Sequence, residues 1–190
     1  MKTTQPLRKK KHVRKLAEYF LIKGQTRNHV LVVMGCHTAL RISDLLRLTW
    51  GDVYDFRLNK ISNSITISEK KTGKSKIIAL HKNIVKALEK LATDNIQQDK
   101  FIFENVRTQR AISRVHAYRI IHDASEALGF EVSISCHSLR KSFGYRAFKS
   151  GMPLAVIMTI YNHSSIAVTM RYLGITQDEI NKVYLNIEMM

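Results

Sequence analysis

The stretch from Cys136 to Tyr172 constrains the chain most, because its reactive side chains can meet only through tertiary folding. His137 and Arg140 stand three residues apart, so on a helix they share a face and can converge on one anion. His163 and Tyr172 are nine residues apart and are not helical neighbours. The anion that calls for several cationic donors and one hydroxyl nucleophile is a phosphodiester. The stretch therefore predicts a phosphodiester-binding site.

The charge balance indicates a polyanionic partner. Lys and Arg number 31 against 15 Asp and Glu, which gives a formal net charge of +16 and a pI near 10. A surplus of that size in a chain without an apolar membrane segment points first to nucleic acid. Proteins that merely coat DNA share this property, so charge alone does not predict catalysis. With 190 residues, the chain is long enough for one domain with a proper core.

Apolar runs and cysteines exclude several other classes. The run Val30–Met34 is too short to span a bilayer, and the segment 16–22 contains a glutamate, so it is no signal peptide. Cys36 and Cys136 are each followed by a histidine, but their spacing fits no zinc pattern. We expect no metal site, and we interpret both cysteines as buried, reduced thiols of a cytoplasmic protein.

The first twelve residues read as a basic arm. They include four consecutive cations, Arg8, Lys9, Lys10 and Lys11. Such a run is either a solvated tail or a strap that contacts the phosphate backbone without reading sequence. We expect an arm that becomes ordered only on DNA.

Periodicity then predicts a mainly α-helical domain with a small antiparallel sheet, an α+β fold. Apolar residues at helical spacing predict several helices, at 13–23, 26–34, 38–50, 84–91, 113–128, 137–150, 153–160 and 176–187. Alternation over 61–80 predicts a β-hairpin that turns at Gly73, and a short strand is expected at 100–103. The flank of the 113–128 helix is as compatible with solvent as with a DNA groove.

Two further features predict catalytic chemistry, and each also has a purely structural interpretation. Arg41 and Asp44 stand one helical turn apart, so Asp44 either holds Arg41 toward a cleft or forms an ordinary surface ion pair. The hairpin turn carries Lys70, Lys71 and Lys74, which either protect a sheet edge or deliver one lysine to a reacting phosphate.

Taken together, residues 38–172 resemble the catalytic domain of the tyrosine recombinases, the phage-integrase type. The similarity lies in Thr-Ala-Leu-Arg-Ile-Ser-Asp, in Lys-Lys-Thr-Gly-Lys, in His-Ser-Leu-Arg, in Asn-His and in Met-Arg-Tyr-Leu, in that order. It implies six catalytic residues, Arg41, Lys71, His137, Arg140, His163 and Tyr172. Which of the three hairpin lysines acts stays open.

Two positions depart from the family pattern. Tyr161-Asn162 precedes the second histidine where Leu-Gly is usual, and asparagine tolerates the left-handed backbone that glycine would supply. Ala39 stands where glycine is usual, which predicts ordinary backbone angles there.

The resemblance also implies a mechanism and an assembly. It implies DNA cleavage through a 3′-phosphotyrosine without metal, cofactor or ATP, by four protomers on double-stranded DNA, with accessory DNA-bending proteins. We expect a basic arm at 1–12, a stand-alone catalytic domain at 13–175 and an amphipathic tail helix at 176–190 that docks on a neighbouring protomer. The expected location is the bacterial or phage-infected cytoplasm, at the nucleoid. The alternatives are a type IB topoisomerase and a non-catalytic DNA-binding regulator.

Overall fold

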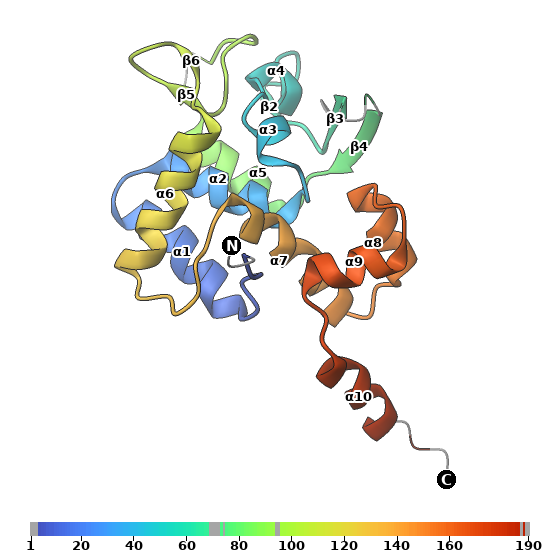
Figure 1. Cartoon of the computed structure of the whole chain (residues 1–190). Helices are drawn as coiled ribbons and strands as arrows, with labels where there is room; N and C mark the ends of the chain where they lie inside the picture. The colour runs from blue at the N-terminus through green and yellow to red at the C-terminus, as the bar shows by residue number, and fades with distance from the viewer. Residues whose placement is uncertain (1–3, 69–72, 74, 94–95, 187, 189–190) are drawn as a thin grey trace.

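The computed structural model describes residues 4–68, 73, 75–93, 96–186 and 188, with only the backbone described for 178–180 and 182–183. Helices dominate it (Figure 1). The longer helices are α1 (Lys10–Ile22), α2 (Thr26–His37), α5 (Lys82–Leu91), α6 (Arg114–Ala127), α7 (Cys136–Lys149), α8 (Leu154–Tyr161), α9 (Ile166–Leu173) and α10 (Gln177–Asn186). The predicted α+β class is confirmed.

Short antiparallel hairpins complete the fold. The strands are β1 (Tyr54–Asp55), β2 (Lys60–Ile61), β3 (Ser64–Ser68), β4 (Ser75–Ala79), β5 (Glu104–Asn105) and β6 (Arg110–Ala111), paired in sequence order. The β3–β4 register runs from Ser64 opposite Ala79 to Ser68 opposite Ser75. Gly73 has a φ of +66°, which is the turn geometry that the sequence predicted there.

The main core surrounds α2. Val30, Leu31, Val32 and Met34 are fully buried, and α1, α5 and α7 pack around this helix. The apolar run therefore lies in a core helix. Within the described part of the chain, no helix is long and apolar enough to cross a membrane.

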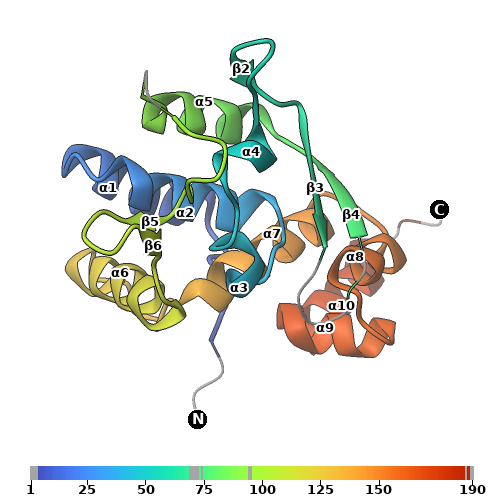
Figure 2. The ribbon, with the colours of Figure 1, turned by 90° about the horizontal axis from the view of Figure 1, so that it is seen from above.

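A second, smaller core lies where α7, α8 and α9 meet. Ile157, Tyr161 and Leu173 are completely buried there, and Tyr172 packs against them. Figure 2 shows α8 and α9 at one end of the molecule, with the hairpin β3–β4 extending toward them. Helix α7 joins the two cores, because its Leu139 belongs to the first and its Phe143 packs on the second.

The segment 38–50 differs from the single helix that was expected. It forms α3 (Ile42–Leu45) and, after a turn at 46–47 and the bridge residue Thr49, α4 (Trp50–Val53). The interruption is stabilised by pairing with 100–102, because the carbonyl of Leu48 accepts from the N–H of Ile102 at 3.0 Å. The expected strand at 100–103 is likewise only a single bridge between Thr49 and Phe101.

The expectation for Ala39 was wrong. Its φ is +55°, so it adopts the left-handed conformation that glycine supplies in the family pattern. Ala39 turns the chain between α2 and α3, and Thr38 fixes this turn by donating from Oγ1 to the carbonyl of Met34 at 2.8 Å. A left-handed alanine costs about 1–2 kcal/mol. The surrounding burial offsets that cost, since Ala39 is only 1% exposed.

Candidate active site

Ser135 opens α7 and thereby places His137 and Arg140 on the first turns of this helix. Its N–H donates to Oγ of Ser138 at 3.2 Å, and its own side chain accepts in return, which forms a capping box. Arg140 is 7% exposed, whereas His137 is exposed. Because a helix N-terminus carries partial positive charge, this end of α7 favours an anion.

Arg140 is held by the last residue of α8. Its guanidinium carbon lies 4.8 Å from the centroid of the Tyr161 ring, and Nη2 donates to the carbonyl of Tyr161 at 3.3 Å. Arginine suits such a site because its flat, delocalised cation stacks on an aromatic face. A permanent positive charge is thus held in a fixed position beside α9.

The turn between α8 and α9 presents His163. Asn162 ends α8 with φ 54° and ψ 47°, which confirms that asparagine replaces the usual glycine in the left-handed conformation. The His163 ring then stacks on Tyr161 at 5.2 Å and 15°, and its Nδ1 lies 3.1 Å from Oγ1 of Thr169. The hydroxyl of Thr169 therefore fixes the orientation of the ring.

Tyr172 lies in the last turn of α9, and Gly174 terminates this helix in the left-handed conformation. The Tyr172 ring meets His163 edge to face, at 5.1 Å and 72°. Nζ of Lys141 lies 5.1 Å from the centroid of the same ring. The structure therefore places Tyr172, His163 and Arg140 close together.

The ionisation of Tyr172 reflects two opposing influences. Burial raises the pKa of its phenol, while the charge of Arg140, a hydrogen bond from Arg140 and the charge of Arg41 lower it in part. The net direction is upward, so the phenol stays protonated near pH 7. To act as a nucleophile, Tyr172 would need a neighbouring proton acceptor.

Arg41 enters the same site from α3. It is the N-cap residue of that helix, and its charge helps lower the pKa of both His163 and Tyr172. Asp44 is 2% exposed, and its N–H donates to the carbonyl of Arg41 at 2.9 Å. Because Asp44 is buried, the alternative of an ordinary surface ion pair is excluded.

His137 and His163 both have lowered pKa values, which favour the neutral imidazole. Burial of part of its ring, followed by the charges of Arg140 and Lys141, lowers the pKa of His137 below its ordinary value of 6.5. Burial, Arg140 and Arg41 do the same for His163. A neutral imidazole can accept a proton, which is the property that a general base requires.

The predicted hairpin lysines, Lys70, Lys71 and Lys74, lie outside the described residues. The neighbouring Lys76 is described, and its Nζ donates to the carbonyl of Ile160 at 2.9 Å. This contact fastens β4 to the end of α8, beside the turn that carries His163. The hairpin is therefore anchored close to the site.

The basic arm differs from the expectation of a tail that orders only on DNA. Lys10 and Lys11 belong to α1, and Leu7 is buried at 2% exposure. The N–H of Leu7 donates to Oγ of Ser142 at 2.7 Å, and Nη2 of Arg8 donates to the carbonyl of Gly174 at 2.9 Å. Leu7 fills an apolar position on the main core, which is why the arm packs without DNA.

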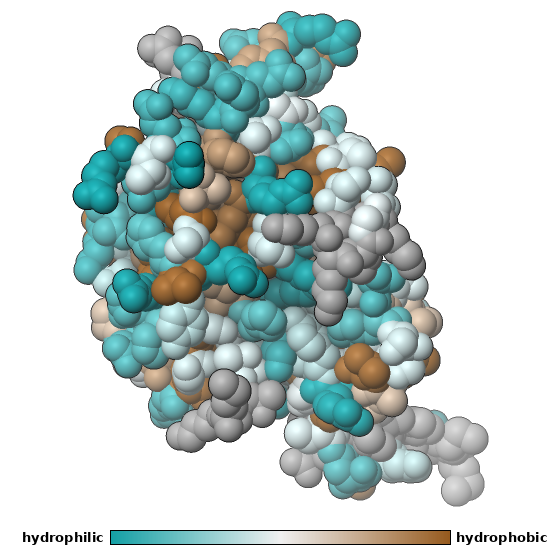
Figure 3. Space-filling view, turned by 45° about the horizontal axis from the view of Figure 1, so that its top comes forward, coloured by the Kyte–Doolittle hydropathy of each residue, from teal (hydrophilic) through white to brown (hydrophobic). Residues whose placement is uncertain are grey.

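A pocket of about 310 Å³ lies beside His137. Its lining comes from α3, α6 and the start of α7, namely Ile42, Arg114, Val115, Tyr118, Ser135, Cys136 and His137. Figure 3 shows a face with mostly hydrophilic side chains and apolar surface in a hollow left of its centre. Val115 and Tyr118 are exposed large side chains that line this pocket with His137.

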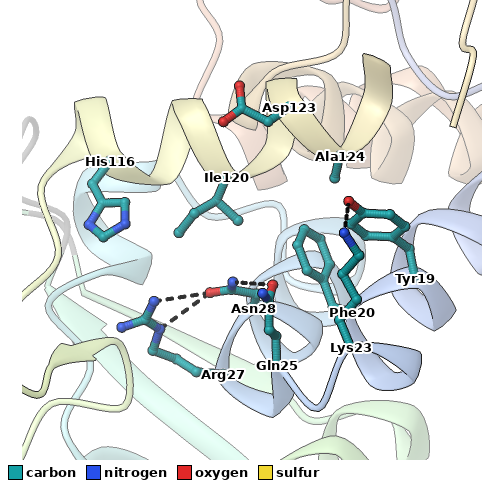
Figure 4. Close-up of a pocket in the computed structure, with 10 residues that line it drawn as sticks. All are labelled: Tyr19, Phe20, Lys23, Gln25, Arg27, Asn28, His116, Ile120, Asp123 and Ala124. Carbon is teal, nitrogen blue, oxygen red and sulfur yellow. Dashed lines mark hydrogen bonds between the residues drawn. The ribbon is translucent and has the colours of Figure 1, made fainter. Parts of the chain in front are cut away.

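A second pocket, of about 390 Å³, lies between α1, α2 and α6 and contains none of the predicted catalytic residues (Figure 4). Several of its polar groups bond to one another. Arg27 donates to Oδ1 of Asn28, whose Nδ2 donates to Gln25, while Lys23 donates to the hydroxyl of Tyr19. We interpret it as packing between the helices.

Sequence reasoning missed Tyr161 and Lys141. Tyr161 was noted only as a departure from the usual leucine, and Lys141 was not singled out. Lys141 is 7% exposed and donates from Nζ to the carbonyl of Thr4 at 2.8 Å. No sequence spacing signals either role, because both depend on contacts between helices.

A mainly helical domain that gathers two arginines, a histidine and a tyrosine at a helix junction has the plan of a tyrosine recombinase catalytic domain. The sequence profile described as the phage integrase family matches residues 8–179. The chain is 34% identical over 184 residues to the probable integrase/recombinase YoeC of Bacillus subtilis, which covers 97% of each protein. The chain therefore belongs to the phage integrase family, and the predicted class of enzyme is confirmed.

Other relatives are longer. The tyrosine recombinase XerD of Mycobacterium leprae is 26% identical over 168 residues, covering 83% of this chain and 51% of XerD. Among solved structures, XerA recombinase superposes with a TM-score of 0.74 at 22% identity, covering 96% of this chain and 65% of XerA. XerH bound to its palindromic difH substrate gives 0.72 at 17% identity, covering 93% and 51%. The chain thus spans about half of XerD and XerH.

Proposed function

We propose that this chain is a site-specific DNA recombinase whose Tyr172 breaks and rejoins DNA strands. The observation that carries the proposal is the placement of the Tyr172 ring against His163, with the charges of Arg41 and Arg140 acting on its phenol. The net charge of +16 suits a DNA partner. The family relationship and the DNA-bound state of XerH support the same assignment.

The chemistry is a transfer between phosphodiesters. The phenolic oxygen of Tyr172 attacks the scissile phosphorus, the tyrosine–phosphate bond forms, and the bond to the 5′-oxygen breaks. The products are a 3′-phosphotyrosine and a free 5′-hydroxyl. Attack by a 5′-hydroxyl of a partner strand reverses the step and releases the tyrosine. Because one ester replaces another, bond energy is conserved and ATP is not needed.

Each site residue receives a role. His137 accepts the phenol proton, and Arg41 and Arg140 hold the non-bridging oxygens, where phosphoryl transfer depends on charge neutralisation. His163 adds a hydrogen bond to the phosphate. Lys71 protonates the departing 5′-oxygen, and Asp44 orients Arg41. The reaction so described uses no metal or cofactor.

DNA binding and assembly follow from the exposed cations and the tail. Lys9, Lys10 and Lys11 are exposed beside the packed arm and would contact phosphates, with Lys70 and Lys74 on the hairpin. Arg8 would do so only in part, because it already binds Gly174. Four protomers would act on two duplexes, with accessory DNA-bending proteins where the target requires them, at the nucleoid of a bacterial or phage-infected cell.

The proposal is tested by trapping protein–DNA adducts. The protein is incubated in EDTA with supercoiled plasmid and with sheared DNA of the source genome, and the reaction is stopped with detergent. Sequencing of the covalently held fragments then identifies the target. The variants compared are Tyr172→Phe and, as a matched control, Tyr19→Phe, whose hydroxyl lies in the pocket between α1 and α6.

We expect adducts from the wild type and from Tyr19→Phe, and none from Tyr172→Phe. Adducts that persist in Tyr172→Phe would show that another group is the nucleophile. Binding of genomic DNA without adducts in any variant would favour a non-catalytic regulator. Relaxation of plasmid without exchange between two target duplexes would favour a topoisomerase.

A further inference from the structure

Tyr161 lies at the centre of the proposed site, although it is not one of the predicted catalytic residues. It is the last residue of α8 and is completely buried. The guanidinium carbon of Arg140 lies 4.8 Å from its ring centroid. His163 stacks on it at 5.2 Å and 15°, and Tyr172 meets it at 5.3 Å and 57°. One aromatic ring therefore contacts three of the proposed catalytic side chains.

The hydroxyl of Tyr161 contacts α7 at two backbone atoms. It donates to the carbonyl of Arg140 at 2.6 Å and accepts from the N–H of Gly144 at 2.9 Å. These two atoms stand four residues apart, so they are the pair that a helical hydrogen bond joins. The hydroxyl therefore fixes the backbone of Arg140, while the ring and the carbonyl of Tyr161 fix its side chain.

Gly144 makes this arrangement sterically feasible. A Cβ added there would lie 2.5 Å from Cε2 and 2.6 Å from Oη of Tyr161, and 2.6 Å from Cδ2 of Leu173. All three distances are below ordinary contact, so any other residue would displace the ring or α9. Leu173 directly follows Tyr172, which means that the same glycine sets how closely α7 approaches the proposed nucleophile.

Leucine, the usual family residue at this position, could fill the space but could not reproduce these contacts. It has no π face to attract a guanidinium and no hydroxyl to bond the backbone of α7. Burial also raises the pKa of Tyr161, so its hydroxyl stays protonated and keeps donating to Arg140. The contacts therefore belong to this side chain and not merely to its volume.

We propose that Tyr161 is a positioning residue for DNA cleavage, which aligns the Arg140 guanidinium, the His163 imidazole and the Tyr172 ring on one scissile phosphate. This inference rests on the proposed recombinase function. Tyr161 acts through Arg140 above all, because it holds that residue by its ring, its hydroxyl and its carbonyl. Its loss should consequently resemble the loss of a preorganised electrostatic donor.

The first test is the rate of single-turnover cleavage of a duplex carrying the target found by adduct sequencing. We expect Tyr161→Phe, which removes only the hydroxyl, to slow cleavage about tenfold. Tyr161→Leu removes the ring as well and should slow it by about 10² or more. The matched control is Phe103→Leu, a completely buried aromatic residue of the main core. It should change the rate by less than about threefold at a temperature where the protein stays folded.

A neutral phosphate separates positioning from general destabilisation. A methylphosphonate at the scissile position removes the negative charge that Arg140 would neutralise. If Tyr161 acts through Arg140, the defect of Tyr161→Leu should shrink at least about tenfold on this substrate. A defect of equal size on both substrates, matched by Phe103→Leu, would overturn the proposal.

A second readout needs no DNA and distinguishes failure of this inference from failure of the proposed function. The Nε–H of Arg140 can be followed by ¹⁵N NMR in the free protein and assigned by its loss in Arg140→Lys. We expect its exchange with solvent to be at least about tenfold faster in Tyr161→Leu than in the wild type and Phe103→Leu. Unchanged exchange in folded Tyr161→Leu would overturn the inference whether or not the wild type forms adducts.

Discussion

Arg8 donates a hydrogen bond to the carbonyl of Gly174 at 2.9 Å, which ties the N-terminal arm to the end of the helix that carries Tyr172. A parallel link runs from the carbonyl of Thr4 to Nζ of Lys141, which also lies 5.1 Å from the Tyr172 ring. The arm thus bonds to two groups close to the proposed nucleophile, the C-terminal end of α9 and Lys141. Its charge is committed partly to the protein, whereas a strap that only binds phosphate would leave it free for DNA.

This packing predicts that Arg8 and its neighbour Lys9 behave differently. Arg8→Gln should slow cleavage by about tenfold beyond any effect on DNA binding, because α9 loses a contact at its C-terminus. Lys9→Gln is the matched control, since Lys9 is exposed and should lower binding only, with a smaller salt dependence. Binding by fluorescence anisotropy and cleavage at saturating protein separate the two effects. Equal loss of binding in both variants, with cleavage at saturation unchanged, would indicate that the arm only contacts the phosphate backbone.

The pH dependence of cleavage should reveal His137. Partial burial and the charges of Arg140 and Lys141 lower its pKa below 6.5, so the imidazole is neutral and able to accept a proton near pH 7. Cleavage should stay high as pH falls to 6.5 and should decline only below that value, as His137 takes up a proton. His137→Gln should be slower and should lack this decline. A decline that persists in His137→Gln would assign it to another group, such as His163.

The free energy of unfolding should also decrease as the pH falls. The lowered pKa values of His37, His137 and His163 mean that the unfolded chain binds protons more readily than the native protein. The free energy of unfolding should therefore be at its full value above about pH 6.5 and should fall as pH decreases through the lower native pKa values. Urea unfolding followed by circular dichroism at several pH values measures this change. An increase in stability on acidification would contradict these pKa directions.

Much of the fold and of the site could be predicted from the sequence. Helical periodicity located α6, because its buried residues Ala117, Ile121 and Ala124 repeat with the period of the helix. The same logic failed at 38–50, where Leu48 pairs with Ile102, a partner more than fifty positions away. Asn162 was predicted to be left-handed from its own chemistry, whereas Ala39 is left-handed only because of the tertiary turn around it.

The supporting contacts inside the site were harder to predict, because they too join distant segments of the chain. Arg140, His163 and Tyr172 were predicted because their residue types indicate phosphate chemistry, and Arg41 was predicted from the resemblance to the family. Tyr161 and Lys141 act by supporting these residues, and their contacts join α7, α8, α9 and the arm. Contacts between segments so far apart leave no periodic pattern, so only the folded structure reveals them.

Gly144 and Tyr161 should be energetically coupled. Gly144→Ala places a methyl group within 2.6 Å of the Tyr161 ring and should destabilise the protein by about 1–3 kcal/mol. In the background of Tyr161→Leu the same change should cost less, because the ring that it strikes is absent. A double-mutant cycle by urea unfolding measures the coupling, which we expect to be about 1 kcal/mol or more. Additive costs would show that Gly144 and Tyr161 do not constrain each other.

Cys36 and Cys136 should resist alkylation in the native protein. Both are buried and free of disulfides, as the sequence predicted, and burial raises the pKa of each thiol to about 12. The reactive thiolate is therefore scarce at neutral pH, and modification by iodoacetamide should be about 10³-fold slower than in denatured protein. Mass spectrometry after timed quenching gives both rates. Equal rates before and after denaturation would contradict the burial of these thiols.

The tail helix α10 is expected to contribute to assembly of protomers on DNA. It projects away from the rest of the molecule (Figure 1), and its Tyr184 and Leu185 are 78% and 82% exposed. We expect these apolar side chains to dock on a neighbouring protomer, because adjacent exposed hydrophobic residues on a helix commonly mark a contact surface. Deleting residues 176–190 should weaken assembly on a two-site duplex more than binding to a single site, as measured by sedimentation and by anisotropy. Tyr184→Ser with Leu185→Ser should reproduce the loss of assembly, whereas an equal loss of both properties would indicate that the tail only supports the fold of the domain.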